Sequence, residues 1–167
     1  PYQRFSRSEA QKKLQDLLQL ADSLGNDRTD YFVAPEEALQ YGLWESNLAS
    51  STFIAKTREF LRTKYPHAKF VLGITSYKRY NTDEITSTAR EMKKAGYFYD
   101  AFNTAIQIDT SAAIPVYHKS QLVIGVERMP FYKLLKPLKN VIHSLSGIYG
   151  SLSYDKERKV FKSLNDT

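Results

Sequence analysis

Residues Lys69 to Tyr77 read Lys-Phe-Val-Leu-Gly-Ile-Thr-Ser-Tyr, an apolar run that includes β-branched residues. Such a run predicts a buried strand. We expect an amphipathic helix directly before it, over Ser51 to Tyr65, because apolar residues recur there at helical spacing and Pro66 ends the pattern. We expect a hairpin after it. Phe98 to Ile108 is rich in aromatic and β-branched residues, and Ala113 to Val116 leads back after a polar turn.

The N-terminal part of the chain extends this alternation. Leucines at three- and four-residue spacing predict an amphipathic helix over Ser8 to Leu24, which Ser8 and Gln11 would open as a capping box. Tyr31 to Ala34 is a short apolar run that predicts a second buried strand. Pro35 to Leu39 resembles the first turn of a helix, where proline and acidic residues are favoured. Helices alternating with apolar strands predict an α/β layered domain.

The remaining segments have weaker patterns. Residues 80–95 are polar and are expected to form a mobile insertion. Residues 117–140 are expected to form a long loop with a helical piece near 130–136, and Ser144 to Ser153 a further loop. Arg158 to Leu164 is a candidate for a last strand.

Composition bounds the function. The 167 residues suit one domain, and 24 Lys+Arg against 18 Asp+Glu give a net charge of +6. This excess suits an anionic partner, but it also serves solubility alone. The chain has no cysteine, which excludes a disulfide scaffold and a cysteine nucleophile within these residues. No apolar stretch is long enough to cross a bilayer. Because the sequence begins at Pro1 without Met, we interpret it as a segment of a longer protein.

Several kinds of site are not expected. His67, His118 and His143 lie far apart and form no zinc-binding spacing, so we expect no metal. The glycines form no phosphate-binding loop, and we expect no cofactor. There is no Gly-x-Ser-x-Gly motif of a serine hydrolase. No aromatic RNA-binding strand or zinc-finger spacing supports a nucleic-acid partner.

Two segments carry candidate chemistry. Glu36 directly follows the predicted strand at Tyr31 to Ala34, a place where α/β folds put their sites and where a carboxylate can act as a general base. The alternative is that this acid only satisfies a helix N-terminus. Lys119 and Glu127 lie in the segment Tyr117 to Phe131, where a lysine among apolar residues can stabilise an oxyanion. The alternative is an ordinary surface lysine and glutamate.

Together these segments resemble a known family. Pro35-Glu36-Glu37-Ala38-Leu39 is similar to a Pro-Glu-[Ser/Thr]-Ala-Leu motif, and the run from Tyr117 to Pro130 is similar to Tyr-x-Lys-x-x-Leu-Val-Pro-x-x-Glu-x-x-Pro. Phe102-Asn103-Thr104-Ala105 is similar to a Tyr-Asn-[Ser/Thr] strand. These motifs belong to the nitrilase (carbon–nitrogen hydrolase) superfamily and, within it, to the bacterial apolipoprotein N-acyltransferases. The sequence departs from the pattern at Glu37, which replaces Ser/Thr, and at Ile124, which replaces Pro.

The resemblance implies a fold and a catalytic site. The fold would be an αββα sandwich, of which residues 1–167 would form a partial domain without its first strand and C-terminal part. Glu36 would be the general base, Lys119 the cation that stabilises the oxyanion, and Glu127 a second glutamate supporting the lysine. The family nucleophile is a cysteine on a later strand. Because this chain has none, we expect it to be an inactive fragment of a periplasmic catalytic domain; the alternative is a pseudoenzyme.

The resemblance also implies partners and a location. The acyl donor would be a phospholipid, and the acceptor a diacylglyceryl-apolipoprotein. The protein would act at the periplasmic face of the bacterial inner membrane. Residues 117–143 would form a loop that faces the lipid, because basic and large apolar residues are interleaved there; the alternative is that several of the apolar residues pack on the sandwich. A truncated domain exposes strand edges, so dimerisation is also expected.

Two alternative functions stay open. A soluble nitrilase-type amidase would share Glu36 and Lys119 but would need no long apolar loop. A basic module that binds anionic lipid or nucleic acid without chemistry would account for the charge alone.

Overall fold

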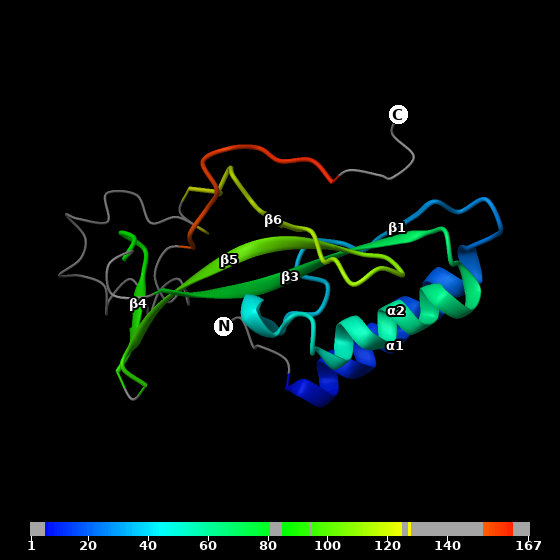
Figure 1. The fold of residues 1–167 in the computed structure, drawn as a ribbon, viewed down its shortest axis with the longest axis horizontal. Coiled ribbons are helices and arrows are strands. Elements are labelled where there is room, and N and C mark those ends of the chain that lie inside the picture. The colour runs from blue at the N-terminus through cyan, green and yellow to red at the C-terminus, as the bar shows by residue number, and fades with distance from the viewer. Residues whose placement is uncertain (1–5, 81–84, 94, 125–126, 128–151, 162–167) are drawn as a thin grey trace.

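The computed structural model describes residues 6–80, 85–93, 95–124, 127 and 152–161. In this part of the chain two α-helices lie on a mixed six-stranded, curled sheet (Figure 1), so the predicted α/β class is confirmed. The elements in chain order are α1 (Arg7–Leu24), β1 (Tyr31–Val33), β2 (Gly42–Trp44), the 3-10 helix η1 (Glu45–Asn47), α2 (Thr52–Lys64), β3 (Lys69–Tyr80), β4 (Arg90–Met92), β5 (Tyr97–Ile108) and β6 (Val116–His118).

The strands β3 and β5 form the centre of the sheet. Each has 12 residues, and they pair antiparallel from Phe70–Ile108 to Tyr80–Phe98. The short strands β1 and β2 both pair parallel with β3, while β4 and β6 both pair antiparallel with β5. The predicted strand at 69–77 and the hairpin that starts at 98–108 are therefore confirmed, with the returning strand placed at Val116–His118.

The helices α1 and α2 lie side by side and cover one face of this sheet (Figure 1). Alternate residues of a strand point to opposite faces, so one set of β3 and β5 side chains meets the helices. That set supplies the centre of the core: Phe70, Leu72, Ile74, Ile106 and Ile108, all at most 2% exposed. The other set, which includes Gly73 and Asn103, faces away from the helices.

The two predicted helices are present with small differences. In α1 the capping box is formed by Ser6 and Glu9, so the expected Ser8–Gln11 pair is wrong. Ser6 is the residue with extended backbone directly before the helix, which the cap position requires. Gly25 directly follows α1 at its C-terminal cap, so the helix ends at Leu24, the last residue of the predicted range.

Two predictions for the segment that connects α1 to α2 are wrong. The strand β1 is not buried, because it lies on the edge of the sheet and only Phe32 of its three residues points into the core. Residues 36–39 form a turn and not the start of a helix. Glu37 and Gln40 have positive φ angles of 51° and 47°, which bend the chain back toward the edge of β3, where β2 pairs.

The weaker predictions have mixed outcomes. The polar segment 80–95 contains β4, and residues 158–161 of the expected last strand are not in a strand. The loop expected at 117–140 starts later, because Tyr117 and His118 belong to β6. The expected helical piece at 130–136, most of the loop at 117–140 and of the lipid-facing candidate 117–143, most of the loop at 144–153, and residues 162–164 lie outside the described residues. In the described part of the chain, no helix combines the length and apolarity that a bilayer crossing needs.

Candidate active site

Glu36 lies in the turn that connects β1 to β2. This turn passes directly over Gly73 of β3: a Cβ atom at that position would lie 2.5 Å from Pro35 O and 2.9 Å from Glu36 Cα. Only glycine allows the backbone to approach this closely. The turn is closed by a hydrogen bond from Gln40 N to Glu37 O at 3.0 Å. Glu36 is thereby held on the sheet face that the helices leave uncovered.

Lys119 lies on the same face as Glu36 but comes from the opposite edge of the sheet, where β6 pairs with β5. It directly follows β6, and its backbone N donates to Asn103 O at 2.8 Å, which continues the pairing of β6 with β5. His118 pairs with Thr104, so the next residue, Lys119, lies on the face of Asn103. The register of β6 therefore decides on which face the lysine lies.

The structure brings together the three predicted site residues. Lys119 Nζ donates to Glu36 Oε1 at 2.8 Å and to Glu127 Oε1 at 3.0 Å. Glu127 is held in turn by the backbone N of Val123, which donates to its Oε2 at 2.8 Å. The catalytic roles of these residues stay predictions, but their proximity was expected from motifs far apart in the sequence.

Asn103 is a fourth member of the cluster, which the sequence did not assign to the site. Its Nδ2 donates to Glu127 Oε1 at 2.8 Å and also to Glu36 Oε1. Its side chain is buried, with a residue exposure of 6%. The available signal was its place in the Phe102-Asn103-Thr104-Ala105 motif, which did not by itself distinguish it from Gln107, a second buried amide of β5.

The electrostatics of the cluster keep Lys119 and Glu127 charged. Burial opposes ionisation of Glu127, but hydrogen bonds from Val123, Asn103 and Lys119 outweigh it and lower its pKa. Burial likewise disfavours the charged Lys119, but its bonds to Glu36 and Glu127 outweigh this and raise its pKa. The lysine is thus a persistent cation at neutral pH and is unsuited to act as a base.

The exposures of the two glutamates differ. The Glu36 side chain is 57% exposed, whereas the Glu127 side chain is 13% exposed. An ammonium group has three N–H donors, and two of those on Lys119 go to the glutamates, which leaves one for an incoming oxygen. The arrangement therefore offers an accessible carboxylate beside a cation that can stabilise negative charge.

Within the described ranges, no group of three or more His, Cys, Asp or Glu side chains is arranged to hold a metal ion. No protein-family model matches the chain, and no curated protein matches it significantly. The assignment of a function therefore depends on the site and on the motifs of the sequence.

Proposed function

We propose that this chain carries the Glu–Lys–Glu part of a nitrilase-type acyl-transfer site, in a protein that N-acylates lipoproteins. An acyl chain would pass from a phospholipid, through a thioester on the protein, to the N-terminal diacylglyceryl-cysteine of an apolipoprotein. The observation that carries the proposal is the contact of Lys119 Nζ with Glu36 Oε1 at 2.8 Å and with Glu127 Oε1 at 3.0 Å. The two motifs of the family resemblance thus contribute to one cluster.

Each residue has a role that suits its surroundings. Glu36 is the general base, because its exposed carboxylate can be reached by a thiol or an amine. Lys119 stabilises the oxyanion of the tetrahedral intermediate with its remaining N–H donor. Glu127 is saturated by Val123, Asn103 and Lys119, so it orients the lysine and does not exchange protons with substrate.

The chemistry proceeds in two half-reactions. In the first, Glu36 takes the proton of a thiol, the sulfur attacks the ester carbonyl of the phospholipid, the C–O bond breaks, and the proton passes to the leaving lysophospholipid oxygen. In the second, the free amine of the acceptor attacks the thioester, its proton passes to Glu36, the C–S bond breaks, and the proton returns to the thiolate. The 167 residues contain no cysteine, so the thiol has to come from outside them.

The proposal also assigns a place to the domain. The helix-covered sheet would be one half of an αββα sandwich, at the periplasmic face of the bacterial inner membrane. Exposed apolar side chains near the site support a lipid substrate. Val123 is 51% and Ile124 is 72% exposed in the segment that leads to Glu127, and Val33 is 73% exposed shortly before Glu36. Apolar groups at the rim of a site favour contact with acyl chains.

The test uses the longer protein that contains both these residues and the nucleophilic cysteine. We expect Glu36→Gln and Lys119→Ala each to reduce acyl transfer from phospholipid to a diacylglyceryl peptide by at least about 100-fold. Transfer is followed by mass spectrometry of the peptide, and the thioester by mass spectrometry of the protein. The matched control is Lys64→Ala, which removes another lysine–carboxylate pair, with Asp22, at the helices. Retained transfer in either site variant contradicts the assigned role.

The same assay separates the alternatives. A soluble amidase would hydrolyse small amides and would not acylate the lipopeptide. A binding module without chemistry would form no thioester, and Glu36→Gln would leave its binding to anionic vesicles unchanged. Either result excludes the proposed acyltransferase.

A further inference from the structure

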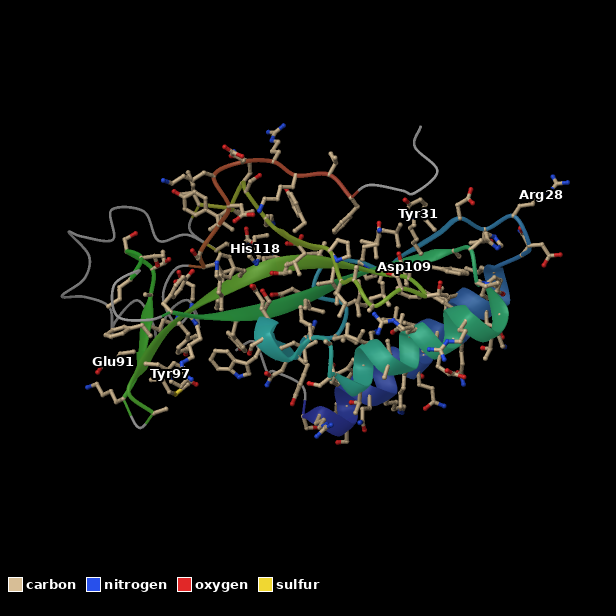
Figure 2. The ribbon with its side chains drawn as sticks, viewed as in Figure 1. Arg28, Tyr31, Glu91, Tyr97, Asp109 and His118 are labelled. Carbon is tan, nitrogen blue, oxygen red and sulfur yellow. The ribbon has the colours of Figure 1, made fainter. Side chains whose placement is uncertain are left out.

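A second polar cluster lies around His118, beside the middle of β5 (Figure 2). His118 Nε2 lies 2.7 Å from Glu45 Oε1, and Nδ1 lies 3.3 Å from Asp155 Oδ1. The imidazole stacks on the ring of Phe102, with 3.9 Å between the ring centroids. The residue is 9% exposed, so these contacts account for most of its surroundings.

The contacts favour the doubly protonated ring. Both ring nitrogens face carboxylate oxygens, and only an imidazolium can donate to both. Burial opposes the charge on His118, but the hydrogen bonds and negative charges of Glu45 and Asp155 outweigh it and raise the pKa. Two further cations act on the carboxylates: Lys159 pairs with Asp155 at 2.7 Å, and Lys78 lowers the pKa of Glu45 through its charge.

The neutral neighbours complete this environment. Ser76 Oγ donates to Glu45 Oε1 at 2.7 Å and lies 2.7 Å from Thr104 Oγ1. Ser76 and Thr104 are on the helix-covered face of β3 and β5, in line with Ile74. His118 therefore points to the helix side, while Lys119, the next residue, lies on the opposite face.

This alternation makes the lysine sensitive to the register of β6. The strand has only three residues, paired with Thr104, Ala105 and Ile106. A shift of one residue would turn Lys119 toward the helix side and away from Glu36. One further backbone hydrogen bond on each side, Gln107 N to Pro115 O and Lys119 N to Asn103 O, extends this pairing. A pairing of this length can still slip by one residue, so directional side-chain contacts add to the definition of its register.

We propose that His118 is a positioning residue for Lys119: its ring, held between Glu45 and Asp155, fixes the register of β6 and thereby places the lysine between Glu36 and Glu127. The contacts join η1, β6 and the segment 152–161 at one point. The inference rests on the proposed function only for what Lys119 does to a substrate. The placement itself can be measured without any substrate.

The test is an NMR titration of Lys119, with the Nζ and Cε signals assigned in the full chain. In the wild type, the contacts with Glu36 and Glu127 raise the lysine pKa. Replacing His118→Phe keeps an aromatic ring against Phe102 but removes both ring nitrogens. If His118 positions the lysine, the Lys119 pKa falls toward its ordinary value of 10.5. If His118 contributes only a positive charge near neutral pH, the Lys119 pKa stays unchanged, because the His118 ring is already neutral in the pH range where the lysine titrates.

Ile54→Val is the matched control, because it weakens the core at α2 without touching the sheet edge and should leave the lysine titration unchanged. An unchanged or raised Lys119 pKa in folded His118→Phe overturns the inference.

If that variant does not fold, a titration of the wild type tests the inference instead. As pH rises through the titration of His118, the Lys119 Nζ signal should shift with it, and a signal that stays constant overturns the inference. A failure of acyl transfer with normal lysine titration would instead count against the proposed function.

Discussion

Glu36 and Glu127 share two donors: the Oε1 atom of each accepts from Asn103 Nδ2 and from Lys119 Nζ. Two carboxylates this close would repel each other without the amide and the ammonium between them. With Lys119 as the only cation in these contacts, the cluster of ionised groups has a net charge of −1. Its geometry therefore depends on both donors, and each can be tested separately.

The amide of Asn103 is the first of these donors. Asn103→Ala removes one buried donor from each glutamate and should lower the free energy of unfolding by about 1–3 kcal/mol. Asn103→Asp adds a third carboxylate at the same place and should cost about 3–5 kcal/mol at pH 7, because a buried charge is left without compensation. The measurement is urea unfolding of both variants.

The pH dependence of the unfolding free energy distinguishes the loss of the amide from the addition of a buried charge in Asn103→Asp. The introduced acid would have a raised pKa in the folded state, so its destabilisation is present above that pKa and disappears below the unfolded value of about 3.9. The stability of Asn103→Asp should therefore approach that of Asn103→Ala as the pH falls from 7 to 4. A constant difference over this range contradicts the assumed contact with the two glutamates.

The ammonium of Lys119 is the second donor. In the wild type the pKa of Glu127 is lowered from 4.5, so its ionisation stabilises the fold above pH 4.5, and this contribution is lost as pH falls through the folded pKa. Lys119→Met should raise the Glu127 pKa, but not fully, because Val123 N and Asn103 still donate to it. Carboxyl ¹³C titration of Glu127 measures the change, with Lys64→Met as the control.

The sequence predicted those parts of the fold that periodicity determines. The helices α1 and α2 have apolar residues at helical spacing, and the long strands β3 and β5 contain apolar, aromatic and β-branched runs, so local pattern and tertiary burial agree. The turn at Glu36 was misjudged as a helix start. Proline followed by acids suits a helix N-terminus, and the positive φ angle of Glu37 leaves no signal in that composition.

The site, too, was predicted only where a local sequence pattern marks its residues. Glu36, Lys119 and Glu127 could be named because they lie in motifs. Asn103 and Gly73 act through contacts between segments far apart in the chain, which one sequence does not reveal. The same holds for His118, whose partners come from η1 and from residues 152–161.

The His118 cluster should make stability depend on pH in a defined direction. Because the folded pKa of His118 is raised above 6.5, its contribution is complete below pH 6.5 and is lost as pH rises through the folded pKa. Glu45 and Asp155 have lowered pKa values, so their contributions are lost on the acid side, below 4.5 and 3.8. The difference in unfolding free energy between wild type and His118→Phe should decrease as pH rises above 6.5. A difference that grows over this range would contradict a raised pKa.

Gly73 tests whether the backbone of β3 positions the base. In Gly73→Ala the new Cβ would lie 2.5 Å from Pro35 O and 2.8 Å from Glu37 N, both backbone atoms, so the turn has to move off the strand. We expect a loss of about 1–3 kcal/mol from overpacking and, in addition, a lower Lys119 pKa because Glu36 is displaced. Gly96→Ala is the control: its φ of 66° makes alanine strained, yet nothing lies within 4 Å of the new Cβ. That variant should lose stability with the Lys119 titration unchanged. If Gly73→Ala also leaves the lysine titration unchanged, Glu36 is not held by its turn over β3.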